Sequence, residues 1–279
     1  MSMNRRSAIG SLAAGATILL RTRQSAGQGA GGRMAEQRLL RSIENAPWIA
    51  TQPEAKRVAY VLWAPWCPYC LQVMKDVVAG SLPDLQLRWI GGSPRNPAQA
   101  QLLAQIVKDG SSGYLTKAVL RESVPDVAVT PEFVQRVAAA DLLYFVLNKE
   151  KQSRGYPTFA YFDGAGIRTS SGYGGPHSAA AVRSGSAGSS TARPQIAYLD
   201  EPWKDLGPAT GRPHQSSGEY TIYSLPSESS VAVDIIRKGY VWPEPLKRYI
   251  GVGKEKWASV STGVSFGSGP KMNGYVRIA

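Results

Sequence analysis

The stretch that decides the fold of this 279-residue chain is Trp63-Ala64-Pro65-Trp66-Cys67-Pro68-Tyr69-Cys70. It follows Arg57 to Trp63, a short apolar run whose length and continuity are typical of a buried central strand. After it, apolar residues recur at helical spacing from Leu71 to Ala79. The sequence therefore predicts a buried strand, a tight turn and a helix that begins at Cys67.

The chain has two cysteines, Cys67 and Cys70. A disulfide-stapled scaffold would carry several cysteines spread along the chain, whereas a lone Cys-x-x-Cys pair is typical of a redox centre. A static disulfide is the alternative, but its very small loop would restrain little of the unfolded chain. The count excludes a four-cysteine zinc site, and His177 and His214 lie far from the pair. We therefore expect redox chemistry and no metal.

The chemistry of such a pair depends on the position of its first cysteine. An exposed Cys67 at a helix N-terminus would meet unpaired backbone N–H groups and the helix dipole, which favour the thiolate. A lowered pKa gives more thiolate at neutral pH and a better leaving group. We expect Cys67 to react with the substrate and a shielded Cys70 to resolve the mixed disulfide. Pro68 is well tolerated in the first helical turn.

Residues 1–30 have the pattern of an export signal. Arg5-Arg6 precedes an apolar run from Ala8 to Leu20, and a small-residue stretch follows at 25–30. This run is shorter than the ~20 apolar residues that span a bilayer. The paired arginines resemble a twin-arginine signal, and an uncleaved signal-anchor is the alternative. In either case we expect the folded part in the periplasm or otherwise exported, where disulfide chemistry is useful.

The pattern between residues 34 and 183 predicts an α/β domain. An amphipathic helix is expected at 34–45 and a second strand at 85–90. A helical insert follows at 93–152, and Thr130-Pro131-Glu132 suits the start of its last helix. The helices expected within this insert are 98–107, 114–120 and 130–149. Next come a strand and hairpin turn within 155–164, and a partner strand at 167–173.

The remaining chain carries no chemical signature. Residues 184–190 are a flexible linker by composition. Residues 191–279 form a β-rich extension of unknown role, with strands expected at 195–199, 219–225, 230–236, 257–266 and 274–278. Two interpretations stay open for this extension. It is either a small β-rich addition packed on the core or a docking module for an envelope assembly.

The cysteine motif resembles the active-site turn of thioredoxin-fold proteins, and a second segment, Arg154-Gly155-Tyr156-Pro157-Thr158, resembles their cis-proline loop. The resemblance implies an α/β thioredoxin-like fold with a helical insertion. It also implies that Pro157 is the cis proline, preceded by Tyr156, and that this loop lies beside the cysteines and binds the substrate backbone. Together with Trp66, Pro68 and Tyr69 around the motif, these residues are the expected substrate contacts.

Within that superfamily, the sequence is similar to the catalytic domains of periplasmic DsbC/DsbG-type disulfide isomerases. The Cys-Pro-Tyr-Cys dipeptide, the helical insert and a closing Gly-Tyr turn at 171–176 carry this similarity. It implies a thiol:disulfide oxidoreductase or isomerase. The family's N-terminal dimerisation domain has no room before the motif, which favours a monomeric oxidase or reductase. The acid that thioredoxin buries on its central strand is replaced by Val61.

We therefore expect dithiol–disulfide exchange on exported proteins, recycled by a membrane or soluble redox partner and without a cofactor. The net charge is +12, but no block of like charges and no nucleic-acid motif is present, so no nucleic acid is expected as a partner. The rival hypothesis is an envelope scaffold or docking protein in which a thioredoxin fold carries only incidental redox activity.

Overall fold

The computed structural model describes residues 30–153, 155–185, 199–200, 203–208, 216–239, 247–250, 254–265 and 271–278. The expected export signal lies outside these residues except for Ala30, which begins helix α1 (Ala30–Asn45). His214, most of the expected linker and most of the strand expected at 195–199 lie outside them as well. No helix in the described ranges is both long enough and apolar enough to cross a bilayer.

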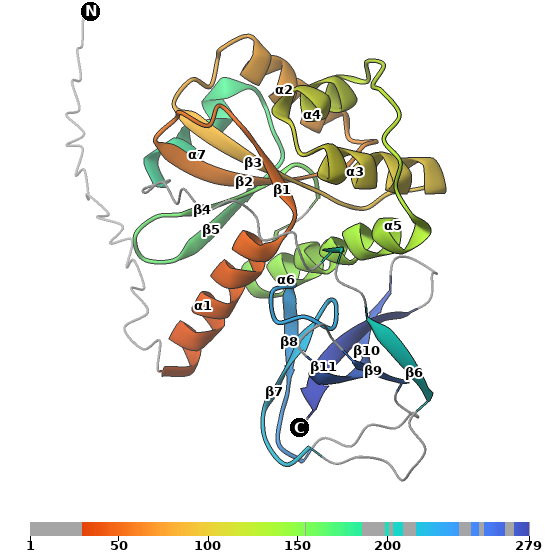
Figure 1. Ribbon diagram of the computed structural model, residues 1–279. Helices are drawn as coiled ribbons and strands as arrows, with labels where there is room; N and C mark the ends of the chain where they lie inside the picture. Colours follow the sequence, from red (N-terminus) through yellow and green to blue (C-terminus); the bar gives the residue numbers. More distant parts are fainter. Residues whose placement is uncertain are drawn as a thin grey trace, which may run out of the picture.

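A five-stranded sheet with the order β1-β3-β2-β4-β5 forms the centre of the N-terminal part (Figure 1). Its strands are β1 (Trp48–Thr51), β2 (Arg57–Trp63), β3 (Leu85–Gly91), β4 (Thr158–Phe162) and β5 (Ile167–Ser171). β2 and β3 are parallel and joined by helix α2 (Pro68–Val78), while the other neighbours are antiparallel. This β-α-β unit, the β4–β5 hairpin and helix α7 (Ala180–Gly185) give a thioredoxin-like α/β fold, as the sequence indicates.

Strand β2 is buried on both faces, which explains its unbroken apolar sequence. Its side chains alternate between two hydrophobic clusters. Ala59, Val61 and Trp63 belong to a cluster under α2, α3 (Pro97–Asp109) and α4 (Ser112–Leu120). Val58, Tyr60 and Leu62 face the opposite way, toward α1 and α6 (Leu142–Lys151).

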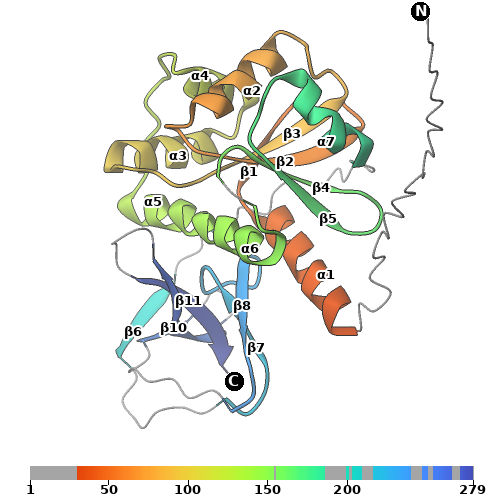
Figure 2. The same ribbon diagram turned by 180° about the vertical axis from the view of Figure 1, so that it is seen from behind.

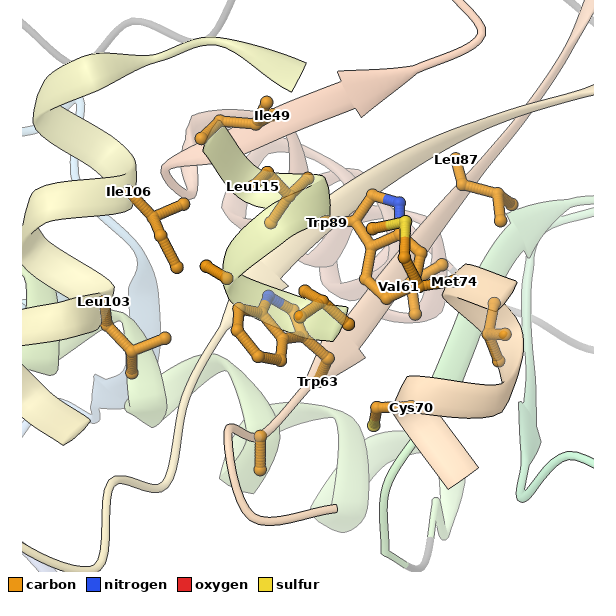
Figure 3. Close-up of a cluster of buried hydrophobic side chains, with 14 of the residues drawn as sticks. Ile49, Val61, Trp63, Cys70, Met74, Leu87, Trp89, Leu103, Ile106 and Leu115 are labelled. Carbon is orange, nitrogen blue, oxygen red and sulfur yellow. The ribbon is translucent and has the colours of Figure 1, made fainter. Parts of the chain in front are cut away.

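The first cluster supports the cysteine motif from behind. Trp63 is 2% exposed and packs edge-to-face on Trp89, with ring centroids 6.4 Å apart. Figure 3 shows side chains from β1, β2, β3, α2, α3 and α4 converging in this cluster, among them Cys70. The cysteine motif is therefore attached to the best-buried part of the sheet.

The helical insert is confirmed, but its last helix is divided. The segment expected as one helix at 130–149 forms α5 (Pro131–Ala138), a 3-10 turn (Ala139–Asp141) and then α6. Thr130 caps α5 as expected, because its hydroxyl accepts the Phe133 N–H at 3.2 Å. The break at the 3-10 turn lets Asp141 point toward the loop that follows β3, where it accepts the Ser93 N–H.

A second, six-stranded sheet with the order β6-β9-β10-β11-β7-β8 forms the C-terminal part. Its strands are β6 (Lys204–Pro208), β7 (Tyr220–Tyr223), β8 (Ala232–Ile236), β9 (Lys247–Ile250), β10 (Lys256–Ser265) and β11 (Lys271–Ile278). The β-rich extension is thus confirmed. Strands β6 and β9 were not expected from the sequence, and neither was β1. The last two residues of α7, Ser184 and Gly185, coincide with the start of the expected linker.

The two sheets share the hydrophobic cluster that contains Val58, Tyr60 and Leu62, and α1 and α6 lie between the sheets (Figures 1 and 2). Buried Ser42 of α1 accepts the Ala232 N–H of β8 and donates to the Ala232 carbonyl, both at 3.1 Å. On the surface, Lys149 of α6 pairs with Asp234 of β8 at 3.0 Å. The C-terminal sheet therefore packs on the N-terminal part through the face that lies opposite α2.

Candidate active site

Cys67 is the N-cap residue of α2, as the sequence predicts. Its backbone is extended, with φ −78° and ψ 118°, and Pro68 occupies the first helical position. Its Sγ accepts the Cys70 N–H at 3.4 Å, which satisfies one of the helix's unpaired donors. Both thiols are free, so the structure shows the dithiol form.

The expectation that Cys67 is exposed is wrong, because the residue is only 3% exposed. Its Sγ points inward, where it contacts the Tyr156 carbonyl oxygen at 3.3 Å. The exposed residues of the turn are Pro68 and Tyr69, and Tyr69 is 58% exposed. Cys70 is 1% exposed and shielded, as expected.

The two thiols have opposite acidities. A hydrogen bond from the Cys70 thiol lowers the pKa of Cys67 to about 6, with further help from the Cys70 and Tyr69 N–H groups and from Arg121, although burial opposes the shift. The pKa of Cys70 is raised because its proton is held by Cys67 and because it is buried. At neutral pH the pair therefore holds one thiolate, on Cys67, and one proton, on Cys70.

This arrangement predicts a single reactive thiolate across the neutral range. Iodoacetamide should alkylate Cys67 at a rate that rises with pH around a midpoint near 6, whereas an unperturbed thiol has a pKa of about 8.5. Arg121→Gln should move the midpoint upward. Mass spectrometry of reduced protein, alkylated and quenched at pH values between 4 and 10, measures the alkylation rate of Cys67 in wild type and in Arg121→Gln. A midpoint at 8 or above, or alkylation of Cys70 at neutral pH, would contradict this assignment.

The expected cis-proline loop lies beside the cysteines. The Tyr156–Pro157 peptide bond is cis, and the Tyr156 carbonyl oxygen lies 3.3 Å from Cys67 Sγ. Pro157 is buried, and its own carbonyl is occupied by the Gly172 N–H at 2.8 Å. The part of the loop that faces the thiol is thus the backbone of Tyr156.

The Tyr156 side chain points away from the thiol and into the helical insert. Its ring stacks on Tyr144 at 4.8 Å and meets Trp66 edge-on at 5.8 Å. Its hydroxyl is 2.8 Å from Ser93 Oγ. Burial raises the pKa of Tyr156, so it stays neutral. Tyr156 was expected to contact the substrate. Its side chain supports the loop, and its backbone carbonyl faces Cys67 Sγ.

Trp66 is held on three sides. Its indole Nε1 donates to the Ser93 carbonyl at 2.7 Å, the Arg95 guanidinium lies 3.7 Å from the ring centroid, and Arg121 Nη2 donates to the Trp66 carbonyl at 3.5 Å. The ring is half-buried. Of the two aromatic residues expected to contact substrate, Trp66 is thus held in place by its neighbours, whereas Tyr69 is exposed.

Sequence reasoning missed Ser93, Arg95, Arg121 and Asp141. No motif marks them, because they come together only when the insert folds back over the cysteine turn. Asp141 is 5% exposed, and its carboxylate contacts Gly92 so closely that a Cβ at that glycine would collide with it. Burial raises the pKa of Asp141 to about 7, although the Ser93 N–H opposes the shift.

The buried Asp141 predicts a pH-dependent stability. In the unfolded chain an aspartate ionises near pH 4, whereas in the folded protein Asp141 stays neutral up to about pH 7. The stability that the neutral Asp141 contributes is therefore fully present below pH 4 and is lost as pH rises through about 7. Asp141→Asn keeps an oxygen acceptor for Ser93 and removes the titration. Its free energy of unfolding relative to wild type should rise by about 2–4 kcal/mol between pH 4 and 8.

Urea unfolding at several pH values measures this difference. The matched control is Glu150→Gln, at an exposed position of α6, which should stay parallel to wild type. Parallel curves for Asp141→Asn and wild type would contradict the raised pKa of Asp141 in the folded protein.

No group of three or more His, Cys, Asp or Glu side chains that could hold a metal ion occurs in the ranges that the structure describes. His177 is exposed and lies in the 3-10 turn (Pro176–Ala179) before α7.

Comparison with known proteins gives matches among solved structures only. No family model matches the chain, and no curated protein does. A thioredoxin-like oxidoreductase from Silicibacter pomeroyi aligns with 14% identity and a TM-score of 0.38, covering 51% of this chain and 94% of that chain. The catalytic domain of Proteus mirabilis ScsC aligns with 14% identity and a TM-score of 0.41, covering 54% and 95%. Salmonella enterica Typhimurium BcfH aligns with 15% identity and a TM-score of 0.36, covering 55% and 81%.

Proposed function

We propose that this protein is a thiol–disulfide oxidoreductase that exchanges disulfides with exported proteins. The observation that carries the proposal is the placement of Cys67. It caps α2, its pKa is lowered to about 6, and the carbonyl before the cis proline lies 3.3 Å from its sulfur. The protein thus has a nucleophilic thiolate next to a proton-bearing partner thiol and a backbone edge on which a client can lie.

The reductive direction has two balanced steps. The Cys67 thiolate attacks one sulfur of the client disulfide, forming a Cys67–client bond and releasing the other client sulfur as a thiolate. Cys70 then gives up its proton and attacks Cys67 Sγ, which breaks the mixed disulfide and releases the second client thiolate. Two electrons pass from the protein dithiol to the client, and the released thiolates take up protons. The oxidative direction reverses both steps.

The export signal pattern at 1–30 supports a location outside the cytoplasm, and a membrane or soluble partner would restore the working redox state. Tyr69, Trp66, Pro68 and the Tyr156–Pro157 loop are the proposed client contacts. Similarity to the DsbC/DsbG-type motif supports isomerase activity as the finer possibility. Oxidase, reductase and isomerase all begin with disulfide exchange at Cys67, and the redox poise of the compartment and the redox partner decide among them.

A single-turnover reaction tests the proposal. Reduced protein, freed of reductant, is mixed with an equal amount of a peptide that holds one disulfide, and both products are identified by mass spectrometry. We expect the protein to become oxidised at Cys67 and Cys70 while the peptide becomes a dithiol. The reverse reaction, oxidised protein with the dithiol peptide, is run in parallel, and if neither reaction proceeds over hours, the scaffold hypothesis replaces the enzyme.

A further inference from the structure

Two arginines from separate helices converge on the residue that precedes the nucleophile. Arg95 lies just before α3, and its guanidinium covers the Trp66 ring at 3.7 Å. Arg121 is the C-cap residue of α4, and its Nη2 donates to the Trp66 carbonyl at 3.5 Å. We call these two residues the arginine pair. It places two positive charges on the rim of the Cys67 site.

The charges of the arginine pair are available to a ligand. Both residues are exposed, and within the described ranges neither has a carboxylate at ion-pair distance. A guanidinium that stacks on an aromatic ring keeps its N–H edge free, and that edge matches a carboxylate in geometry. The nearby acid, Asp141, is buried beneath the loop and is used by Ser93.

The backbone fixes where the Arg121 side chain begins. Its φ is +63°, in the left-handed region that helix C-caps usually fill with glycine. The C-cap of the preceding helix α3 is a glycine, Gly110, with φ +73°. Gln152, the C-cap residue of α6, is also a non-glycine residue in this region, with φ +55°, so the role of Arg121 rests on its contact with Trp66 and on its charge. The guanidinium at Arg121 is therefore placed beside Cys67 in a position where glycine would fit the backbone better.

We infer that the preferred clients carry an aspartate or glutamate beside the reactive cysteine, whose carboxylate binds the arginine pair while the sulfur meets Cys67. This inference rests on the proposed function, because it names the substrate class of the same site. The exposed Tyr69 and the fixed Trp66 ring give the client backbone an apolar surface next to the charges. A basic residue at the same client position meets two like charges and is rejected.

Three cyclic peptides test the inference. Each has the same length and one internal disulfide, and the residues that flank its cysteines are acidic, neutral amides or lysines. The rate constant for oxidation of the reduced protein is measured by stopped-flow at pH 8.5, where Cys67 is a thiolate with or without its arginine neighbours. At low salt we expect the acidic peptide to react about 5–20 times faster than the neutral one, and the lysine peptide more slowly. In about 0.5 M salt the preference should shrink, because screening weakens exposed charges.

Two double variants separate the arginine pair from the net charge of the protein. Arg95→Gln/Arg121→Gln should reduce the acidic-to-neutral rate ratio to about 1–2, as expected when the local charges are removed. Lys238→Gln/Arg248→Gln removes two exposed positive charges from the C-terminal part and should keep the ratio within about twofold of wild type. The ratio is compared within each variant, so a change in Cys67 reactivity cancels.

The outcomes distinguish this inference from the proposed function. If all three peptides react at similar rates, or if the control variant loses the preference as fully as the arginine variant, the inference is overturned while the oxidoreductase stands. If no peptide reacts with wild type in either direction, as a disulfide with the reduced protein or as a dithiol with the oxidised protein, the proposed function itself fails.

Discussion

Replacing Cys67 by serine should abolish disulfide exchange while leaving the fold intact. The thiolate is the nucleophile, and a hydroxyl at the same N-cap position can still accept the Cys70 N–H. We expect the exchange rate to fall by about 10³-fold or more, to the level of the reaction without protein. The measurement is the single-turnover reaction with a disulfide peptide, with circular dichroism to verify the fold.

Cys70→Ser is the matched variant, because it removes the resolving thiol and keeps the nucleophile. It should react once with the peptide and then persist as a mixed disulfide through Cys67, since no internal thiol can release the client. Mass spectrometry detects this adduct. Full turnover by Cys67→Ser, or the absence of an adduct with Cys70→Ser, would contradict the assigned roles.

Trp63→Ala should cause a large loss of stability. The indole is 2% exposed, packs edge-to-face on Trp89 at 6.4 Å and ends the central strand just before the cysteine turn. Removing a buried tryptophan side chain leaves a cavity that costs about 3–5 kcal/mol in the free energy of unfolding. Urea unfolding followed by circular dichroism measures this loss.

Two further variants keep the stability prediction testable if Trp63→Ala does not fold. Trp63→Phe retains a ring and should lose about 1–3 kcal/mol. Val78→Ala, at a position of α2 that is 61% exposed, should stay within about 0.5 kcal/mol of wild type. Equal effects at the buried and exposed positions would show that Trp63 is not part of the core.

The sequence was most informative where the structure depends on local pattern. The run from Arg57 to Trp63 predicts β2 with its bounds because a central strand buried on both faces must be apolar throughout. Thr130 and Pro131 predict the start of α5 because capping is local chemistry. The segment with Tyr156 and Pro157 was located by its resemblance to a known loop, and the structure shows the cis bond there.

Other elements depend on contacts between distant residues, which no local pattern reveals. Strand β1 has four residues and is defined by its pairing with β3. Strand β6 contains Gly207 and Pro208, has mostly exposed side chains and lies at the edge of its sheet, so it lacks the alternation that marks a half-buried strand. The helix break before α6 is invisible in the sequence, because Ala138, Ala139 and Ala140 are all good helix formers.

The active site shows the same division. Its two cysteines are readable from the sequence because their chemistry depends on their spacing, and the proline loop is readable through its resemblance to a known loop. The burial of Cys67, the inward position of the Tyr156 ring and the buried Asp141 follow from how the insert packs over the loop after β3. Arg121 acts on Cys67 from the end of α4, although 53 residues separate their positions in the sequence.

The central claim is that Cys67 and Cys70 form a reversible redox pair. Its most direct test is to equilibrate the protein with glutathione buffers of known ratio and to measure the fraction of oxidised protein. Pairs whose first thiol has a pKa near 7 and near 3.5 have potentials of about −270 and −120 mV. With the pKa of Cys67 at about 6, we expect a reversible two-electron transition between these values. A pair that stays wholly oxidised or wholly reduced across all ratios would contradict the claim.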